Sequence, residues 1–501
     1  MNRYAYILIL CLLLCGTAAS GQTYDRVHRD NLWNASENIT GVRQDTVSRS
    51  CVLLSGRYED GGFKDTWQAA RGWSAGVSTA SIRHLERMSL KGSFAFEQTE
   101  GYDMCGSMFI KPGFYPVDVL EFTPGRKTLQ TYSFDGGISY DLADSWRIGA
   151  RVDFESSNLA KRKDLRHSNM RLDFDLAPGF MYHSGELAFG ANYFFRKTSE
   201  TVEADQLGIS ESSYYAFLDK GLMYGVYSIW TGSGLHLDES GVKGFPVKEF
   251  SNGAAVQMQY RGLFAQIEYI NTSGTIGEKE YIWFRFPGNS VNVYLGYRHD
   301  TGKVRHYARL NFGMNERKLD ETVHEKVTVG GVSTVVTHGK NRISSENVWT
   351  VKPEYELVAE GFEVLASAHM SVQRKSSFQM YPYIYMQSLA DYGADVQVKT
   401  RLGRFDLSAG IACAAGTVYE EDLLADDASG VQTEPYRLQD WYDRQIEYRT
   451  APRLGAGLSL RWNFFKGLYM EASGKWMHGF GLRYMTSADR FAASFGLGYD
   501  F

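Results

Sequence analysis

The stretch that decides the fold class is Arg490–Phe501, RFAASFGLGYDF. One set of alternate positions is apolar: Phe491, Ala493, Phe495, Leu497, Tyr499 and Phe501. The other set is small or polar: Arg490, Ala492, Ser494, Gly496, Gly498 and Asp500. Because successive side chains of a strand point to opposite faces, this stretch predicts a β-strand with lipid on one face and a lumen on the other.

The same alternation recurs along nearly the whole chain. In residues 146–155 Trp, Ile, Ala, Val and Phe alternate with Arg, Gly, Arg, Asp and Glu, and residues 169–176 repeat the pattern. The signal of any single strand is weak, so it is the repetition of the pattern that indicates a membrane β-barrel. The sequence therefore predicts an all-β fold, a transmembrane antiparallel β-barrel of about 18 strands, with a range of 14 to 20, over residues 50–501.

Connections between the segments predict the orientation. Short turns at 142–144, 183–185, 261–262, 360–361, 402–403 and 466–467 are typical of the periplasmic side, whereas 98–128, 199–247, 317–344 and 419–447 are expected to be long extracellular loops. About nineteen segments alternate, but an even number is required, so one segment between Glu278 and Trp349 is counted in excess. Because unpaired backbone groups are costly in lipid, the first strand, near Val52–Glu59, should pair with the last.

The N-terminal residues are expected to lie outside the barrel wall. Residues 1–21 have the basic start, apolar run and small-residue end of a secretory signal peptide, and the run is too short to cross a bilayer. A lipoprotein anchor at Cys15 is the alternative, although Leu14 precedes it where a small residue is usual. Residues 22–49 are polar and irregular, which predicts a periplasmic segment or a plug in the lumen.

Composition excludes several classes of protein. The chain is 44% hydrophobic but has a mean hydropathy of −0.32, and no segment after residue 21 approaches a membrane helix. A formal charge of −5 argues against nucleic acid as a partner. Cys51, Cys105 and Cys413 have no metal-binding spacing, and no cofactor or metal motif is present.

The faces predicted to point inward carry interleaved charges of both signs. The lumen-facing candidates are Arg147, Arg151, Asp153, Arg171, Asp173, Arg305 and Arg309. Charges on neighbouring strands can form ion pairs that hold the wall together. The alternative is a selective polar path, although such paths more often use rings of one sign.

Two resemblances to known families accompany these patterns. An aromatic final residue resembles the C-terminal recognition strand of Gram-negative outer-membrane barrels; this implies that the barrel-assembly machinery and outer-membrane lipid are partners and that Phe491, Phe495, Tyr499 and Phe501 form the membrane-assembly strand. Residues 33–41, WNASENITG, resemble the Asn-Pro-Ala-Gly motif of the FadL-like and PorV-like barrels. Asn38 and Gly41 match its outer positions, whereas Ile39 and Thr40 replace its proline and alanine. The resemblance implies a plugged lumen, with Asn34, Asn38 and Gly41 as plug residues; a simple turn is the alternative.

Three functional classes follow in order of preference. The first is a porin-like channel or transporter for a hydrophobic or amphiphilic small molecule, as the FadL-like resemblance implies. The second is an accessory or docking barrel for a surface or secreted protein. The third is a membrane hydrolase, but His167-Ser168 and His183-Ser184 come without a nucleophile motif, so no enzyme is predicted. The aromatic segment within 199–247 should cover the barrel mouth or face a partner, and the acidic 419–447 could bind calcium or a sugar.

Overall fold

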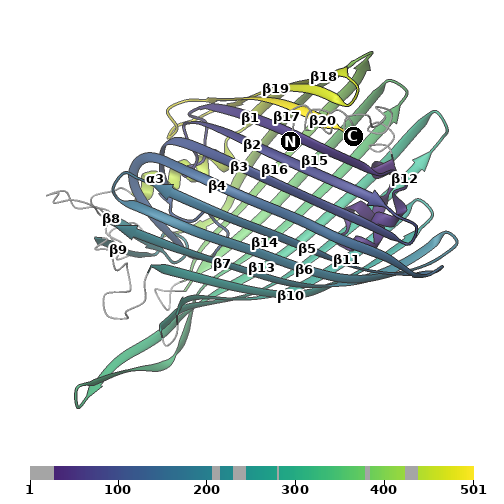
Figure 1. Cartoon of the computed structure of the whole chain (residues 1–501). Helices are drawn as coiled ribbons and strands as arrows, with labels where there is room; N and C mark the ends of the chain where they lie inside the picture. Colours follow the sequence, from purple (N-terminus) through teal and green to yellow (C-terminus); the bar gives the residue numbers. More distant parts are fainter. Residues whose placement is uncertain (1–26, 206–214, 230–243, 279–280, 379–383, 424–437) are drawn as a thin grey trace, which may run out of the picture.

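The computed structural model describes residues 27–205, 215–229, 244–278, 281–378, 384–423 and 438–501. Eighteen strands form a closed antiparallel barrel, as predicted, and Figure 1 shows them inclined to the barrel axis. The wall strands are β1 (Arg49–Gly61), β2 (Arg71–His84), β3 (Met88–Ser107), β4 (Asp118–Ala143), β5 (Trp146–Lys161), β6 (Arg166–Ser184), β7 (Leu187–Asp205), β10 (Phe245–Tyr260), β11 (Leu263–Glu278), β12 (Tyr281–Asp300), β13 (Val304–Val329), β14 (Val332–Ala359), β15 (Phe362–Ser377), β16 (Tyr385–Leu402), β17 (Phe405–Asp422), β18 (Arg453–Phe465), β19 (Leu468–Gly479) and β20 (Asp489–Asp500).

The barrel closes where β1 meets β20. The two strands pair from Cys51 opposite Asp500 to Gly61 opposite Arg490. At the end of the seam, Ser50 and Phe501 exchange two backbone hydrogen bonds of 2.9 Å. The predicted pairing of first and last strands is therefore confirmed.

Besides the elements of the N-terminal segment, the described residues form three short elements outside the wall. Strands β8 (Tyr215–Asp219) and β9 (Gly225–Ile229) form a hairpin whose first strand pairs with the start of β4, while β7 pairs directly with β10. Helix α3 (Leu438–Thr450) precedes β18. Among the described residues, no helix has the length and apolarity needed to cross a bilayer.

Long and short connections separate to opposite ends of the barrel. The predicted short turns fall between strands, for example between β4 and β5 and between β14 and β15. Helix α3 and the β8–β9 hairpin lie at the other end, and the two ends are plain in Figure 1. By the barrel rule, the short-turn end is periplasmic and the end with α3 is extracellular.

The predicted extracellular loops were too long. The segment 317–344 is mostly strand: β13 and β14 continue to a turn between Val329 and Val332 and form a hairpin that projects from the barrel in Figure 1. Both faces of this hairpin meet water, so the apolar-polar alternation that marks a lipid-bound strand is lost there. Likewise β3 runs to Ser107 and β17 to Asp422, where the sequence predicted loops.

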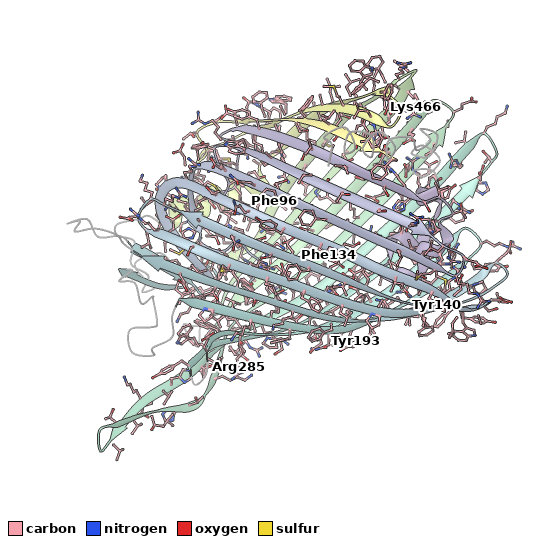
Figure 2. The ribbon with its side chains drawn as sticks, viewed as in Figure 1. Phe96, Phe134, Tyr140, Tyr193, Arg285 and Lys466 are labelled. Atoms are coloured by element: carbon pink, nitrogen blue, oxygen red, sulfur yellow. The ribbon has the colours of Figure 1, made fainter. Side chains whose placement is uncertain are left out.

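The outer face of the wall is apolar. Phe134 and Tyr193, labelled in Figure 2, are 50% and 47% exposed on the outside of the barrel. On β20, Phe491, Phe495 and Phe501 beyond it are exposed and Tyr499 is half-buried. A broad exposed apolar surface around a closed barrel is the arrangement that lipid requires. The protein is a multi-pass β-barrel of the outer membrane; the predicted signal peptide, residues 1–21, lies outside the described residues.

Candidate functional site: the plugged lumen

Residues 27–48, here called the plug, lie inside the periplasmic end of the barrel. They contain two 3-10 turns, η1 (Leu32–Ala35) and η2 (Ile39–Gln44). The side chain of Asn31 caps η1 by accepting a hydrogen bond from the backbone N–H of Trp33, and Asn38 caps η2 through that of Thr40. Asparagine suits these positions because its side chain satisfies N–H groups that a short helix leaves free. The two asparagine caps therefore define the two turns of the plug.

The apolar anchor of the plug is Trp33. Its indole is 1% exposed, packs edge-on against Phe264 of β11 with ring centroids 5.3 Å apart, and donates a 2.6 Å hydrogen bond to Gln259 of β10. A Cβ on Gly41 would lie only 2.4 Å from the Cβ of Trp33, so the close approach of the two turns requires glycine there.

Charged and polar contacts surround this anchor. Arg29 forms two 3.0 Å hydrogen bonds with Glu363 of β15, and the Asp30 carboxylate accepts from Arg305 of β13 at 3.3 Å. Further plug-to-wall contacts are Glu37 with Arg196 at 2.8 Å, Arg43 with Asp141, the Asp30 carbonyl with Arg298 at 2.7 Å, and the Asp30 carboxylate with Tyr307. These contacts run from β4 round to β15, over much of the lumen wall.

The three plug residues predicted from the sequence lie in this segment. Asn38 donates hydrogen bonds to the backbone carbonyls of Phe180 and Ala191, at 3.0 and 3.3 Å, and to Gln257 at 3.1 Å. Asn34 donates to the carbonyl of His28 at 2.7 Å, within the plug. Asn38 and Gly41 therefore join the plug to the wall and to itself, whereas Asn34 acts locally.

The extracellular end is covered by three elements, here called the cap: residues 108–117, the β8–β9 hairpin and α3. Met108, Phe109 and Val117 belong to a buried apolar cluster with β7, β8, β10 and β12. Trp441 of α3 packs edge-on against Phe122 of β4, with ring centroids 5.4 Å apart. Polar groups are buried here too: burial raises the pKa of Asp219 on β8.

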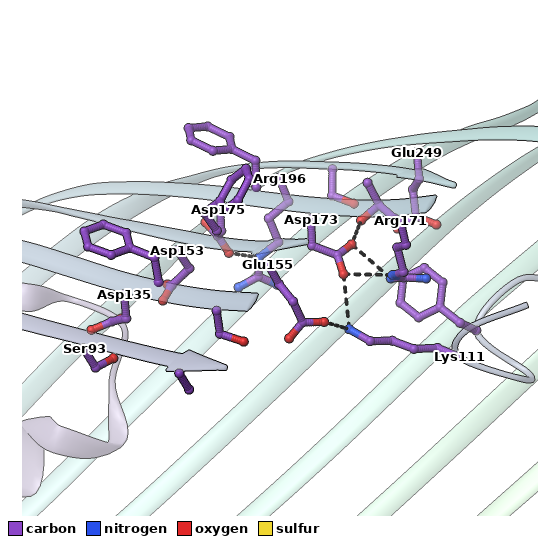
Figure 3. Close-up of a pocket in the computed structure, with 18 of the residues that line it drawn as sticks. Ser93, Lys111, Asp135, Asp153, Glu155, Arg171, Asp173, Asp175, Arg196 and Glu249 are labelled. Atoms are coloured by element: carbon purple, nitrogen blue, oxygen red, sulfur yellow. Dashed lines mark hydrogen bonds and ion pairs between the residues drawn. The ribbon is translucent and has the colours of Figure 1, made fainter. Parts of the chain in front are cut away.

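A cavity of about 650 Å³, here called the chamber, lies between the plug and the cap. Lys111 and Phe114 reach it from the cap loop, and Arg196, which holds Glu37 of the plug, lines it from β7. The other charged lining residues are Asp135, Asp153, Glu155, Arg171, Asp173, Asp175, Glu249 and Arg317. Figure 3 shows carboxylates and cations meeting across this space.

Ion pairs organise most of these charges. Lys111 lies 2.8 Å from Glu155 and 3.1 Å from Asp173, and Arg171 lies 2.8 Å from Asp173 (Figure 3). Arg171 also meets Glu200 at 3.3 Å, Arg196 pairs with Asp175, and Arg151 lies 2.6 Å from Asp135 and 3.0 Å from Asp153. The cap loop is thus tied to β5 and β6 through one lysine.

The predicted lumen-facing residues divide into three groups. Asp153, Arg171 and Asp173 line the chamber, with Arg151 paired to two of its carboxylates. Arg305 holds the plug through Asp30. The remaining two stabilise the wall: Arg147 lies 3.0 Å from Asp141 and Arg309 lies 2.8 Å from Glu356. The printed sequence alone did not single out Lys111, Glu249 or Arg317, because they lay within or beside predicted loops.

A second cavity, of about 320 Å³, lies on the extracellular side of the cap loop. It is lined by Tyr115, by Asp118 and Asp219 of the β4–β8 pair, and by Arg449 of α3. Arg317 lines both this outer cavity and the chamber. Residues 108–117 therefore form the partition between the two spaces.

The histidines considered as catalytic bases have structural surroundings. His167 is buried on β6 and lies 2.9 Å from the side-chain oxygen of Asn169. His183 lies on β6 next to the turn that joins β6 to β7. Among the described residues, no group of three or more His, Cys, Asp or Glu is placed to hold a metal ion.

Fold and lumen together define an outer-membrane β-barrel that carries its own internal plug. Residues 40–501 match the model of the Family of unknown function (DUF6850), and the chain belongs to that family. No curated protein matches the chain.

Solved structures with similar shape are large outer-membrane barrels. The FrpB iron transporter from Neisseria meningitidis aligns with a TM-score of 0.45 and 10% identity, over 90% of this chain and 81% of that one. The copper transporter OprC aligns with a TM-score of 0.43 and 9% identity, over 90% of this chain and 80% of that one. OccAB3 from Acinetobacter baumannii aligns with a TM-score of 0.36 and 10% identity, over 91% of this chain and 99% of that one. At these scores the cargo named for those proteins is a property of those proteins alone.

Proposed function

We propose that this barrel is a gated transporter of a small polar solute across the outer membrane, with the plug as its periplasmic gate. The observation that carries the proposal is the chamber: a charged cavity between two closures inside a closed barrel. A wall of 18 strands is wide enough to leave an aqueous passage unless something fills it. Here the plug and the cap narrow it, and in this proposal the plug is the closure that moves.

The chamber lining favours a polar solute over the hydrophobic ligand implied by the FadL-like resemblance. An apolar molecule in this space would displace water from several carboxylates and guanidinium groups without replacing its hydrogen bonds, which is unfavourable. A polar solute can make those hydrogen bonds itself. A hydrophobic cargo stays a prediction from the resemblance, without support in the charges of this cavity.

The contacts of the plug suit a part that moves. The side chains of its ion pairs with Arg196, Arg305 and Glu363 are 18–37% exposed, so water can replace these contacts at small net cost. Its buried apolar residues fall into two small clusters, Leu32 and Trp33 against β6, β7 and β11, and Ile39 and Val42 against Ile82 of β2. The wall, by contrast, is held by continuous strand ladders on every side.

Planar-bilayer conductance tests the proposal. Full-length protein should be closed or open only briefly, and a variant in which residues 27–48 are replaced by a Gly/Ser linker of the same length should conduct steadily. A linker replacing residues 324–337 in the projecting hairpin is the matched control and should leave the full-length behaviour unchanged. A plug-less barrel that is folded but silent would contradict the proposal.

A docking barrel is the second candidate, and the β13–β14 hairpin favours it. Beyond Glu321 and Ser344 the two strands pair with each other and with no other described strand. Exposed strand edges are sites at which another chain can pair. Silence of both the full-length and the plug-less barrel would support this alternative.

A further inference from the structure

Two charged side chains that line the chamber form no ion pair with a described residue. Among the lining residues that the structure describes, Lys111, Arg171, Arg196 and all carboxylates but one have an ion-pair partner. The exceptions are one anion, Glu249 of β10, and one cation, Arg317 of β13. The chamber is thus left with one unpaired charge of each sign.

Glu249 is a buried carboxylate that faces the chamber without a partner. Its side chain belongs to the inner face of β10, is 8% exposed, and makes no hydrogen bond with any described residue. Figure 3 shows it at the edge of the cavity, with no interaction drawn to it. Opposite it in the β10–β11 ladder is Gly274, which has no side chain to offer. Since a buried charge without hydrogen bonds is costly, this carboxylate is suited to receive a donor from a molecule in the chamber.

Arg317 has N–H groups that are available to a further hydrogen-bond acceptor. One N–H group donates to the backbone carbonyl of Phe114 in the cap loop, and the guanidinium lies 5.4 Å from the centroid of the Phe114 ring. A guanidinium carries five N–H donors, so most of its capacity is left. Its charge acts on Glu249 through space, yet the two side chains form no direct ion pair. An anion and a cation therefore border one cavity with a gap between them.

We propose that Glu249 and Arg317 form the recognition site for a zwitterionic solute, an amino acid or short peptide. The ammonium group of the solute donates to Glu249, and its carboxylate accepts two parallel hydrogen bonds from Arg317. This inference rests on the proposed function, since it names the solute class that the transporter accepts. A chamber of about 650 Å³ is within the usual size of small-molecule sites. A metal ion would require several ligands together, and the described residues offer no such group.

The position of Arg317 also supplies an order of binding. Because it lines the outer cavity as well as the chamber, a solute arriving from outside meets the guanidinium before it meets Glu249. The carboxylate end is then held first, by N–H donors that the Phe114 carbonyl does not use, and the ammonium end reaches Glu249 afterwards.

Isothermal titration of detergent-purified protein tests the site with four probes. Triglycine carries both charges, N-acetyltriglycine only the carboxylate, triglycine amide only the ammonium, and maltotriose neither. Each probe is titrated into the full-length barrel and into the barrel with residues 27–48 replaced by the linker, so that access does not limit binding. Triglycine should bind at least about tenfold more tightly than each of the other three, because each charged end adds a charge-assisted hydrogen bond. Equal binding of all four, or none in either protein, would overturn the proposal.

Charge-removing variants separate the two ends of the solute. Glu249→Gln should erase the advantage of triglycine over N-acetyltriglycine, and Arg317→Gln should erase its advantage over triglycine amide. Arg317→Lys keeps the charge and should retain part of the affinity, which guards against a loss caused by misfolding. Glu471→Gln on β19, outside the chamber lining, is the matched control and should bind like the wild type. A plug-less barrel that conducts but shows no zwitterion preference would overturn this site while leaving the transporter intact.

Discussion

Trp33→Ala should release the plug while leaving the barrel folded. Trp33 is almost wholly buried between the plug and the wall, and it supplies the ring contact with Phe264 and the hydrogen bond to Gln259. No strand ladder passes through it, so the wall keeps all its backbone hydrogen bonds. The substitution therefore acts on plug docking rather than on the barrel.

The size of the effect follows from burial. Truncating a buried tryptophan to alanine costs about 3–5 kcal/mol. Since each 1.4 kcal/mol is a factor of about ten in an equilibrium constant, the ratio of docked to released plug should fall about 10²-fold at the lower cost and several thousandfold at the higher one. The remaining ion pairs are partly solvated and recover little of this loss.

Hydrogen exchange measures the release directly. The backbone N–H groups of Gly41 and Asp45 are bonded within η2, to the carbonyls of Asn38 and Val42, and they exchange when the plug undocks and its turns open. Their protection should fall sharply in Trp33→Ala. The control is Trp146→Ala, because Trp146 is 45% exposed on the lipid face and touches no part of the plug. Unchanged protection in Trp33→Ala, or loss of the folded heat-modifiable band, would refute the reasoning.

Three shorter predictions concern the wall and the cap. Phe495→Arg places a charge on the lipid face and should destabilise the barrel by about 2–4 kcal/mol, measured by urea titration in lipid. Ser494→Arg is the control, because residue 494 points into the lumen, and it should cost far less. Equal losses of stability in the two variants would contradict the assigned faces. Phe501→Ala should reduce the amount of heat-modifiable barrel in the outer membrane, and normal assembly would count against the role of this residue. Burial raises the pKa of Asp219, so the folded cap is more stable when this carboxyl is protonated. As the pH falls from that raised pKa to the ordinary pKa of an aspartate, protection of the β8 amides against hydrogen exchange should therefore increase. Asp219→Asn should weaken this dependence, and Asp219→Asn with Asp118→Asn should remove it, because Asp118 lies opposite Asp219 on β4 and burial raises its pKa as well. A protection that instead grows with pH would reverse the sign of the argument.

Most of the barrel could be predicted because lipid imposes a strict rule on every strand. The alternation in 490–501 and 146–155 survives in the structure, and the need for an even strand number corrected the initial count. Where no lipid faces the chain, the rule does not apply. The projecting part of β13 and β14 is wet on both faces, and α3 buries only Leu438, Trp441 and Tyr442, too few for a clear helical pattern.

The chamber was harder to predict for a related reason. Glu249 lies at the extracellular end of β10, just after the segment 199–247 that was predicted to be a loop. The alternation of β10 extends toward its N-terminal end, with Phe250 on the outer face and Glu249 on the inner face. Extending the predicted strand by these residues would therefore have placed the Glu249 carboxylate in the lumen. Arg317 lay in a predicted loop. Which charges pair and which remain unpaired depends on contacts between strands far apart in sequence and with Lys111 of the cap loop, and one sequence does not specify those.

The central claim, that residues 27–48 control passage through the barrel, is tested most directly by tethering the plug. A Cβ on Gly137 of β4 would lie 2.7 Å from Cγ1 of Ile39 and 3.5 Å from the nearest backbone atom, the carbonyl oxygen of Ala150, which brings cysteines at positions 39 and 137 within disulfide reach without a clash in the wall. The pair Ile39→Cys and Gly137→Cys is placed in the Trp33→Ala protein, with Cys51, Cys105 and Cys413 changed to serine. Single-channel recordings should show a closed barrel while the tether is oxidised and steady conductance once a reductant is added. The same current before and after reduction would contradict the account.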